Sequence, residues 1–304
     1  MESPVTSVDA ARLGELLLKT SRTFALSIPV LPEPTRAEVT VAYLLFRIAD
    51  TLEDATEWEP ERQTDELDRF ARLLDDRTVI PAEKLACRWT EEPPLENAAY
   101  LELLAELPAV LAALDRLHPE ARELVIRDTR RTAERMILFV GRPRPLQLRD
   151  VPDLRDYCYA VAGIVGEMLT ELFLLGRPQL AEAAGAMRAD AARFGEALQL
   201  VNILKDAAFD RDEGRSYLPA DVERAGIFTL ARGDLDAAEA YVRRLQRHEA
   251  PRGIVAFTAL PVLLARRTLD RVERDGPGAK VTRPEVAEIV VALDAALAAG
   301  EAAV

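Results

Sequence analysis

Apolar residues recur every three or four positions along almost the whole chain, which is the spacing of one buried face on an α-helix. Proline and glycine interrupt this pattern, and the stretches between them predict helices. The predicted helices cover about Val8–Lys19, Thr35–Ala55, Glu61–Leu74, Leu95–Leu117, Pro119–Val140, Asp153–Leu175, Pro178–Phe209 as one helix or two, Leu235–Arg247, Pro251–Glu273 and Arg283–Ala299. No stretch alternates apolar and polar residues for long enough to support a sheet. The sequence therefore predicts an all-α protein, with residues 1–304 forming a single domain.

Four polar or ionisable side chains lie on one face of the helix predicted near Thr35–Ala55. They are spaced i, i+4, i+7 and i+11, one continuous line on a helix with 3.6 residues per turn, and they are Tyr43, Arg47, Asp50 and Asp54. Two carboxylates one turn apart cost a helix only about 0.2–0.5 kcal/mol, which a solvent-exposed face tolerates. For this pair alone, an exposed acidic face is the alternative to a functional site.

A second line of the same length lies near the end of the helix predicted at Pro178–Phe209. It places two amides before two carboxylates, at i, i+3, i+7 and i+11, and consists of Gln199, Asn202, Asp206 and Asp210. A purely solvated face has no need of amides among apolar neighbours, so the repetition favours a functional site. Because Mg²⁺ prefers oxygen ligands and shares them with substrate phosphates, the two lines predict a diphosphate held through Mg²⁺, with Mn²⁺ as a substitute.

No grouping of Ser, His and Asp, or of Cys and His, predicts a catalytic nucleophile. His118 and His248 have no suitable partner nearby in the sequence, and Cys87 and Cys158 are expected to be ordinary buried thiols in a reducing compartment. An allylic diphosphate needs no enzymatic nucleophile, because cations draw electrons toward the leaving group and favour its departure. The residues therefore favour ionisation of an allylic diphosphate.

Composition narrows the range of partners and compartments. The 304 residues are 49% hydrophobic and 6% aromatic, which suits one large helical domain, and the formal net charge of −13 argues against nucleic acid and anionic lipid as partners. The first 20 residues do not resemble a secretory signal, and no run approaches 18 consecutive apolar residues. We expect a cytoplasmic protein, favoured as a monomer, with transient peripheral contact at the inner face of a membrane as the alternative.

Three longer runs, residues 20–55, 156–173 and 194–219, carry a family resemblance. They read TSRTFALSIPVLPEPTRAEVTVAYLLFRIADTLEDA, DYCYAVAGIVGEMLTELF and FGEALQLVNILKDAAFDRDEGRSYLP. In content and order they resemble the signature regions of the squalene/phytoene synthase family, the head-to-head prenyltransferases, over about Leu17–Pro219. The resemblance implies an all-α isoprenoid-synthase fold whose two acidic motifs face each other across a central apolar cavity. It also implies that two isoprenoid diphosphate molecules are joined through a cyclopropyl diphosphate intermediate.

The resemblance further implies roles for individual residues. The residues that match the family's Mg²⁺-binding aspartates and their neighbours in the metal and substrate shell are Asp50, Asp54, Asp206, Asp210, Asn202, Gln199 and Tyr43. The residues that match its diphosphate-binding flap and phosphate-binding arginines are Ser21, Arg22, Thr23, Arg47 and Arg215. Lys205 stands where the family commonly has Arg, so a point charge replaces a bidentate fork and would hold diphosphate less rigidly.

Two aromatic residues and two closing segments complete the comparison with the family. Tyr157 matches a tyrosine implicated in proton transfer or carbocation handling, with a core aromatic as the alternative. Phe257 resembles a residue that lines the cavity of the second half-reaction, although an ordinary core position is nearly as good an explanation. The flap at Ser21–Phe24 and the loop at Asp212–Ser216 are the expected closing segments.

The product depends on features that the aspartates do not specify. The run RIADTLED resembles squalene synthases more than phytoene synthases, so we expect two farnesyl diphosphates to give presqualene diphosphate and then squalene, with NADPH as reductant. Lys280 and Arg283 are candidate contacts for NADPH, with a solvated loop as the alternative. The rival functions are a reductant-free synthase of phytoene, dehydrosqualene or hydroxysqualene, and, more remotely, a terpene cyclase or a non-catalytic helical scaffold.

Overall fold

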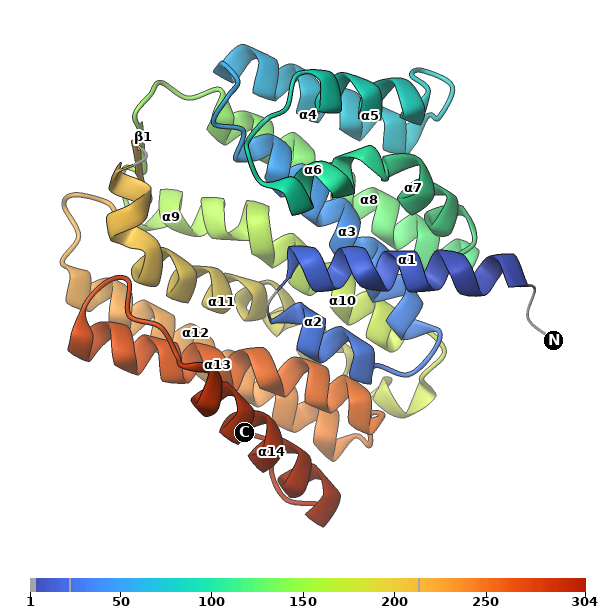
Figure 1. The fold of residues 1–304 in the computed structure, drawn as a ribbon. Helices are drawn as coiled ribbons and strands as arrows, with labels where there is room; N and C mark the ends of the chain where they lie inside the picture. The colour runs from blue at the N-terminus through green and yellow to red at the C-terminus, as the bar shows by residue number, and fades with distance from the viewer. Residues whose placement is uncertain (1–3, 22, 213) are drawn as a thin grey trace. The chain divides into compact units, whose positions relative to one another are not determined.

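The computed structural model describes residues 4–21, 23–212 and 214–304. The chain divides into two compact units, one formed by residues 1–29 and 33–141 and the other by residues 30–32 and 142–304. Within the described residues the secondary structure is almost entirely helical (Figure 1), as the sequence predicts. The organisation of residues 1–304 as a single domain stays a prediction.

The first unit is built around one long helix that carries the first acidic line. Its helices are α1 (Pro4–Thr20), α2 (Phe24–Ser27), α3 (Thr35–Glu53), α4 (Pro60–Asp75), α5 (Ala82–Glu91), α6 (Ala98–Ala105), α7 (Leu107–Asp115) and α8 (Pro119–Val140), and the short 3₁₀ turn η1 (Ile28–Val30) follows α2. Helix α3 packs against α1, α4 and α8, and most of its side chains are buried. Its strong burial explains why apolar periodicity predicted its start and end so closely.

The second unit carries the second acidic line and Tyr157. Its elements are β1 (Leu146–Gln147), α9 (Val151–Cys158), the π-turn η2 (Tyr159–Gly163), α10 (Ile164–Leu174), the 3₁₀ turn η3 (Pro178–Leu180), α11 (Ala184–Asp212), β2 (Arg215–Ser216), α12 (Arg224–Arg247), α13 (Arg252–Asp275) and α14 (Arg283–Ala299). Helix α11 is the centre of this unit, because α9, η2, α10, α12 and α13 all pack on it. In Figure 1, α12 and α13 lie side by side, and they also contact each other directly.

Two segments of the first unit differ from the prediction. Helix α5 was not predicted, and it is held by Trp89, which is fully buried and donates its indole N–H to Glu66 at 3.0 Å. The helix expected over Leu95–Leu117 is instead α6 and α7, which meet at Glu106. Pro108 lies in the first turn of α7, and since it has no N–H it cannot extend the hydrogen bonds of α6.

Helix α12 begins eleven residues before its predicted start at Leu235. Gly226 and Gly233 both lie within this helix. The early turns form because Ile227, Phe228 and Ala231 are buried, so tertiary packing outweighs the weak helix propensity of glycine.

A two-residue parallel pairing of strands also departs from the expectation of no sheet. Leu146 pairs with Arg215 and Gln147 with Ser216, and the Leu148 N–H donates to the Ser216 carbonyl at 3.1 Å. The pairing is too short to produce an alternating pattern in the sequence. It fixes the segment after α11 beside the segment that leads into α9.

Two glycines let helices of the second unit approach each other at backbone distance. A Cβ placed on Gly195 of α11 would lie 2.0 Å from the Ala162 carbonyl oxygen of η2. A Cβ on Gly166 of α10 would lie equally close to the Ala191 carbonyl oxygen. The two glycines therefore allow η2 and α10 to contact α11 at backbone distance.

The two cysteines differ in environment. Cys158 is fully buried, and burial raises the pKa of its thiol, so the prediction of an inert core thiol is correct there. Cys87 is exposed, with its thiol 3.3 Å from Glu91, so the prediction that it is buried was wrong. The error follows from the failure to predict α5. Without that helix, the exposed side on which Cys87 lies could not be identified.

One helical run in the described part of the chain, Val151–Leu174, is long and apolar enough to cross a membrane by length and composition alone. The expectation of no such segment rested on uninterrupted apolar runs, and this run contains charged residues. In the structure 56% of the run's apolar window is buried within the protein, as is usual for a core helix. Its apolar character is therefore explained by packing in the second unit.

Candidate active site

The first acidic line is the partly open face of an otherwise buried helix. Between Val41 and Ala55, every residue is buried except Glu53 and the four predicted residues Tyr43, Arg47, Asp50 and Asp54. A solvated helix face would leave a broader stripe exposed, with polar residues across it. The narrow opening therefore favours a site over the alternative of an exposed acidic face.

Arg47 is held by aromatic and acidic neighbours in this opening. Its guanidinium carbon lies 5.6 Å from the ring centres of both Tyr43 and Tyr100, and its Nη1 is 3.3 Å from the Asp50 carboxylate. The Tyr43 hydroxyl accepts a bond from Arg47 Nε at 3.3 Å and donates to the Thr20 carbonyl at 2.8 Å. These contacts orient the cation, and Tyr100 is a contributor that no spacing in the sequence identified.

Asp50 has an unusual environment for a partly exposed carboxylate. Its side chain is 31% exposed, yet burial raises its pKa to about 6, with Arg47 opposing the rise and the charge of Asp54 adding to it. The carboxylate is therefore short of compensating charge. A divalent cation would supply that charge, which is the first indication that the residues fit a metal ion.

The predicted flap is only partly described. Arg22 lies outside the described residues. The Ser21 hydroxyl accepts the Phe24 N–H at 2.9 Å, which supports the first turn of α2, and Thr23 precedes that helix without a side-chain cap. The ring of Phe24 lies 5.6 Å from that of Tyr43, so the flap and the first acidic line are in contact within the first unit.

A lysine side chain lies beside the second acidic line. Lys205 Nζ lies 3.1 Å from the Asp206 carboxylate and donates to Asn202 Oδ1 at 3.3 Å. Asn202 is exposed, and Gln199, Asp206 and Asp210 are half-buried on the same line. The lysine at this position therefore contacts two predicted metal ligands directly.

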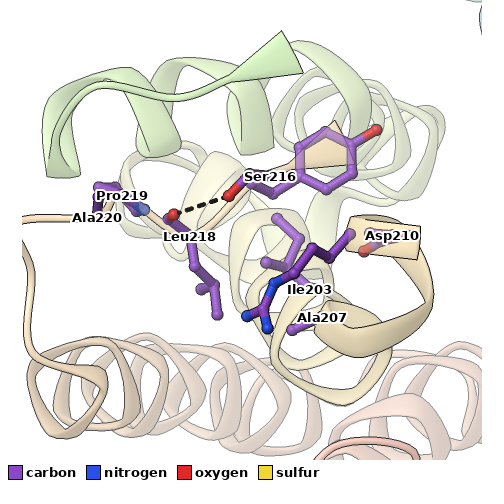
Figure 2. A pocket seen from close by; sticks show the side chains of 9 residues that line it. Ile203, Ala207, Asp210, Ser216, Leu218, Pro219 and Ala220 are labelled. Carbon is purple, nitrogen blue, oxygen red and sulfur yellow. Dashed lines mark hydrogen bonds between the residues drawn. The ribbon is translucent and has the colours of Figure 1, made fainter. Parts of the chain in front are cut away.

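A cavity of about 260 Å³ adjoins this line in the second unit. Figure 2 shows Ile203, Ala207 and Asp210 on α11, with Ser216, Leu218 and Pro219 from the following segment across the cavity. The Ser216 hydroxyl donates to the Leu218 carbonyl at 3.3 Å, which shapes the turn. Asp210 thus borders a space of mixed polarity. Arg215 lies beside it in β2, paired through its backbone with Leu146.

Tyr157 is buried, with 4% of its surface exposed, at the end of α9. Its ring stacks on that of Tyr217 with centres 4.6 Å apart and planes 24° from parallel. The π-turn Tyr159–Gly163 follows directly, and such turns occur often at functional sites because they re-aim the neighbouring side chains.

The remaining predicted residues lie in the same unit but are less defined by contacts. Phe257 is 3% exposed and packs edge-on against Phe173 at 5.9 Å, which suits either a cavity wall or a core position. Lys280 and Arg283 are exposed near the start of α14. The loop that carries Lys280 touches the second acidic line, because the Gly278 N–H donates to the Lys205 carbonyl at 2.7 Å.

The donors of each line suit Mg²⁺ as a shared rather than an enclosed ion. Among the described residues, no three His, Cys, Asp or Glu side chains gather closely enough to hold a metal by themselves. Mg²⁺ usually takes one or two carboxylates and completes its shell with water and substrate phosphate. Asp50 with Asp54, and Asp206 with Asp210 and Asn202, would supply such incomplete sets of oxygen ligands.

The squalene/phytoene synthase family matches residues 17–228, which is most of the chain. The chain belongs to the squalene/phytoene synthase family. Within it, the squalene synthase of Eremothecium gossypii is 28% identical over 228 residues, a match that covers 71% of this chain and 47% of the relative. The chain thus spans about half the length of the curated relatives it matches.

Two solved structures place this squalene/phytoene synthase family member in its fold class. The complex of TcSQS with a ligand aligns with a TM-score of 0.72 at 24% identity, over 93% of this chain and 85% of that one. The squalene synthase HpnC from Alicyclobacillus acidocaldarius aligns with a TM-score of 0.56 at 20% identity, over 90% of this chain and 97% of that one. The expected all-α isoprenoid-synthase fold is confirmed.

This family member also contains a buried ionic network that was not predicted from the sequence. Arg155 of α9 donates to Glu196 of α11 at 2.7 Å and to Asp234 of α12 at 3.1 Å, and Arg193 donates to Asp234 at 3.0 Å. Asp234 is 1% exposed, and burial raises the pKa of Glu196. The network joins the helix of Tyr157 to α11 and α12.

We expect Asp234→Ala to destabilise the fold by about 2–3 kcal/mol, because Arg155 and Arg193 would lose the carboxylate that pairs them. Urea unfolding followed by circular dichroism measures the change. Asp270→Ala is the matched control, since Asp270 pairs with Arg232 at 3.0 Å but is 61% exposed, and such pairs contribute about 0–1 kcal/mol. Equal losses in the two variants would show that burial does not make the Asp234 pairing stronger.

Proposed function

We propose that the protein joins two farnesyl diphosphates head to head, forms presqualene diphosphate, and reduces it with NADPH to squalene. The observation that carries this proposal is the narrow opening on α3, where Arg47, Asp50 and Asp54 are the charged groups of the predicted line on an otherwise buried helix. The family match and the second acidic line on α11 support it. Mg²⁺, when bound, would neutralise the diphosphate and make it a better leaving group.

The chain's own residues would divide the work between binding and chemistry. Asp50, Asp54, Asp206 and Asp210, with Asn202, would hold the metal ions. Arg47, beside Asp50, and Lys205, beside Asp206, would contact diphosphate oxygens. Ser21 and Thr23 in the first unit, and Arg215 in the second, would add further donors to diphosphate. Because these donors are fixed before the substrate ionises, they stabilise the departing charge without a reorganisation cost.

Tyr157 is the proposed group at the reacting carbons. It lies in a buried aromatic pair, where water is excluded and a phenol can accept or return a proton next to a carbocation. Exclusion of water matters because water would trap the cation as an alcohol. Phe257 would present an aromatic face to a cation in the second half-reaction.

The product assignment is tested by incubating the purified protein with farnesyl diphosphate and Mg²⁺, with and without NADPH, and analysing the products by gas chromatography and mass spectrometry. We expect squalene with NADPH, and accumulated presqualene diphosphate without it. Geranylgeranyl diphosphate is added as a competitor, and it is expected to give little phytoene.

Other outcomes separate the rival functions. Dehydrosqualene or hydroxysqualene as the main product, whether or not NADPH is present, would overturn the reductive step. Phytoene as the preferred product would overturn the choice of substrate. A cyclic hydrocarbon would indicate a terpene cyclase, and Mg²⁺-dependent ligand binding without turnover would indicate a non-catalytic scaffold. Contact of Lys280 and Arg283 with NADPH is part of the proposal, and a lower affinity for NADPH in Lys280→Ala would support it.

A further inference from the structure

Tyr217 lies between the cavity of the second unit and Tyr157. It follows β2 by one residue, lines the cavity that Asp210 borders, and stacks on Tyr157. Its side chain is nearly buried, at 7% exposure. Two residues before it, Arg215 is a proposed diphosphate contact. A single short segment therefore joins a phosphate-binding position to the ring that covers Tyr157.

The geometry of the pair is that of a supporting stack rather than general core packing. The centres are 4.6 Å apart and the planes 24° from parallel. Two other aromatic pairs of this unit meet edge-on, Phe173 with Phe257 at 80° and Phe194 with Tyr241 at 60°. Stacked rings attract each other beyond the effect of the area that they bury, so the contact favours one orientation of Tyr157.

The backbone around Tyr217 is held independently of its ring. Ser216 pairs with Gln147, its carbonyl accepts the Leu148 N–H, and its hydroxyl donates to the Leu218 carbonyl. Tyr217 is therefore presented from a fixed backbone. Tyr157 lies in the last turn of α9, directly before the π-turn, and its ring meets that of Tyr217.

We propose that Tyr217 is a positioning residue for Tyr157: its ring, through the stack, holds the Tyr157 phenol in its working orientation and links that orientation to the segment that carries Arg215. The role is assigned to the ring, because the stack is a contact of the ring. The inference rests on the proposed function for its catalytic consequence, but the orientation of Tyr157 can be measured without substrate.

The test compares Tyr217→Phe, which keeps the stacked ring, with Tyr217→Leu, which removes it. The first half-reaction is measured without NADPH. We expect Tyr217→Phe to keep kcat within about twofold, and Tyr217→Leu to lower kcat by about 10- to 100-fold with little change in KM, the size of effect caused by misplacing a reacting group. Thermal unfolding establishes that both variants are folded at the assay temperature.

A second measurement reports on Tyr157 directly. The protein has six tyrosines, so incorporation of 3-fluorotyrosine should give a small set of ¹⁹F resonances, and Tyr157→Phe identifies that of Tyr157. We expect this resonance to shift and broaden in Tyr217→Leu, because the neighbouring ring is lost, and the ring of Tyr157 to remain ordered in Tyr217→Phe.

The outcomes distinguish the positioning role from the proposed function. An ordered Tyr157 resonance with normal kcat in folded Tyr217→Leu would overturn the inference. So would an equal loss of kcat in Tyr217→Phe, because the hydroxyl would then be the important group. If even the parent protein forms no presqualene diphosphate, the proposed function fails, while the ¹⁹F spectra still decide whether Tyr217 orders Tyr157.

Discussion

Asp50→Asn is expected to lower turnover of farnesyl diphosphate by roughly 10²- to 10³-fold or more, and Asp206→Asn to do the same, the scale seen when a group that stabilises transition-state charge is removed. Each substitution keeps the size of the side chain but removes a negative charge that would hold Mg²⁺. Asp50 is the more sensitive of the two, because it lies in the narrow opening of α3, where its charge is poorly solvated. Product formation under saturating Mg²⁺ measures the loss.

Glu53→Gln is the matched control for the first substitution. Glu53 is also half-buried on α3, but it lies off the line formed by Tyr43, Arg47, Asp50 and Asp54. We expect it to leave turnover nearly unchanged. Mn²⁺ binding, followed by electron paramagnetic resonance in the presence of diphosphate, should weaken in the two aspartate variants and not in the control. Full activity of both aspartate variants, with unchanged helical circular dichroism, would exclude the metal assignment.

Gly195→Ala is expected to have the largest effect on the fold. The added methyl group would lie 2.0 Å from the Ala162 carbonyl oxygen, and since that atom belongs to the backbone, η2 and α11 would have to separate. Overpacking of this kind costs about 1–3 kcal/mol or more. We expect a marked fall in the urea midpoint and, because Tyr157 lies just before η2, a loss of activity as well.

Gly185→Ala in the same helix provides the control. A Cβ at Gly185 meets no atom within 4 Å, and alanine is favoured over glycine inside a helix by about 0.5–1 kcal/mol. This variant should therefore be as stable as the parent or slightly more stable. A similar loss of stability in both variants would mean that the contact with Ala162 does not control stability at Gly195. Helix propensity or structure remaining in the unfolded state would then be the cause.

Apolar periodicity predicted the helices that are buried along one face. Helices α3, α8 and α14 agree with their predicted ranges to within two residues, because each has a sustained apolar stripe or a proline near its start. Helix α5 was missed because its stability depends on Trp89 and on the distant residue Glu66. The early start of α12 was missed for a similar reason, since its glycines are tolerated only in the packed protein.

The candidate site, like the fold, could be predicted only in part. Residues on one helix could be predicted, because helical spacing brings Arg47 beside Asp50. Lys205, which lies beside Asp206, was named only through the family resemblance. Contacts between segments could not. The Tyr157–Tyr217 stack depends on a strand pairing of two residues, and Tyr100 reaches Arg47 from a separate helix. In the sequence, the one indication of Tyr217 was its position two residues after Arg215, a predicted phosphate contact.

The position of Lys205 bears on how the protein would depend on Mg²⁺. Its ammonium group bridges Asn202 and Asp206, and Arg47 is similarly close to Asp50, so each acidic line already contains a fixed positive charge. Each line therefore has one positive charge beside it, which offsets the repulsion between its carboxylates only in part. We expect divalent metal to be needed for binding of diphosphate and not for folding, so the protein should keep its fold when Mg²⁺ is removed by chelation and added again. Asp206 would hold the ion, and Lys205 beside it would contact diphosphate.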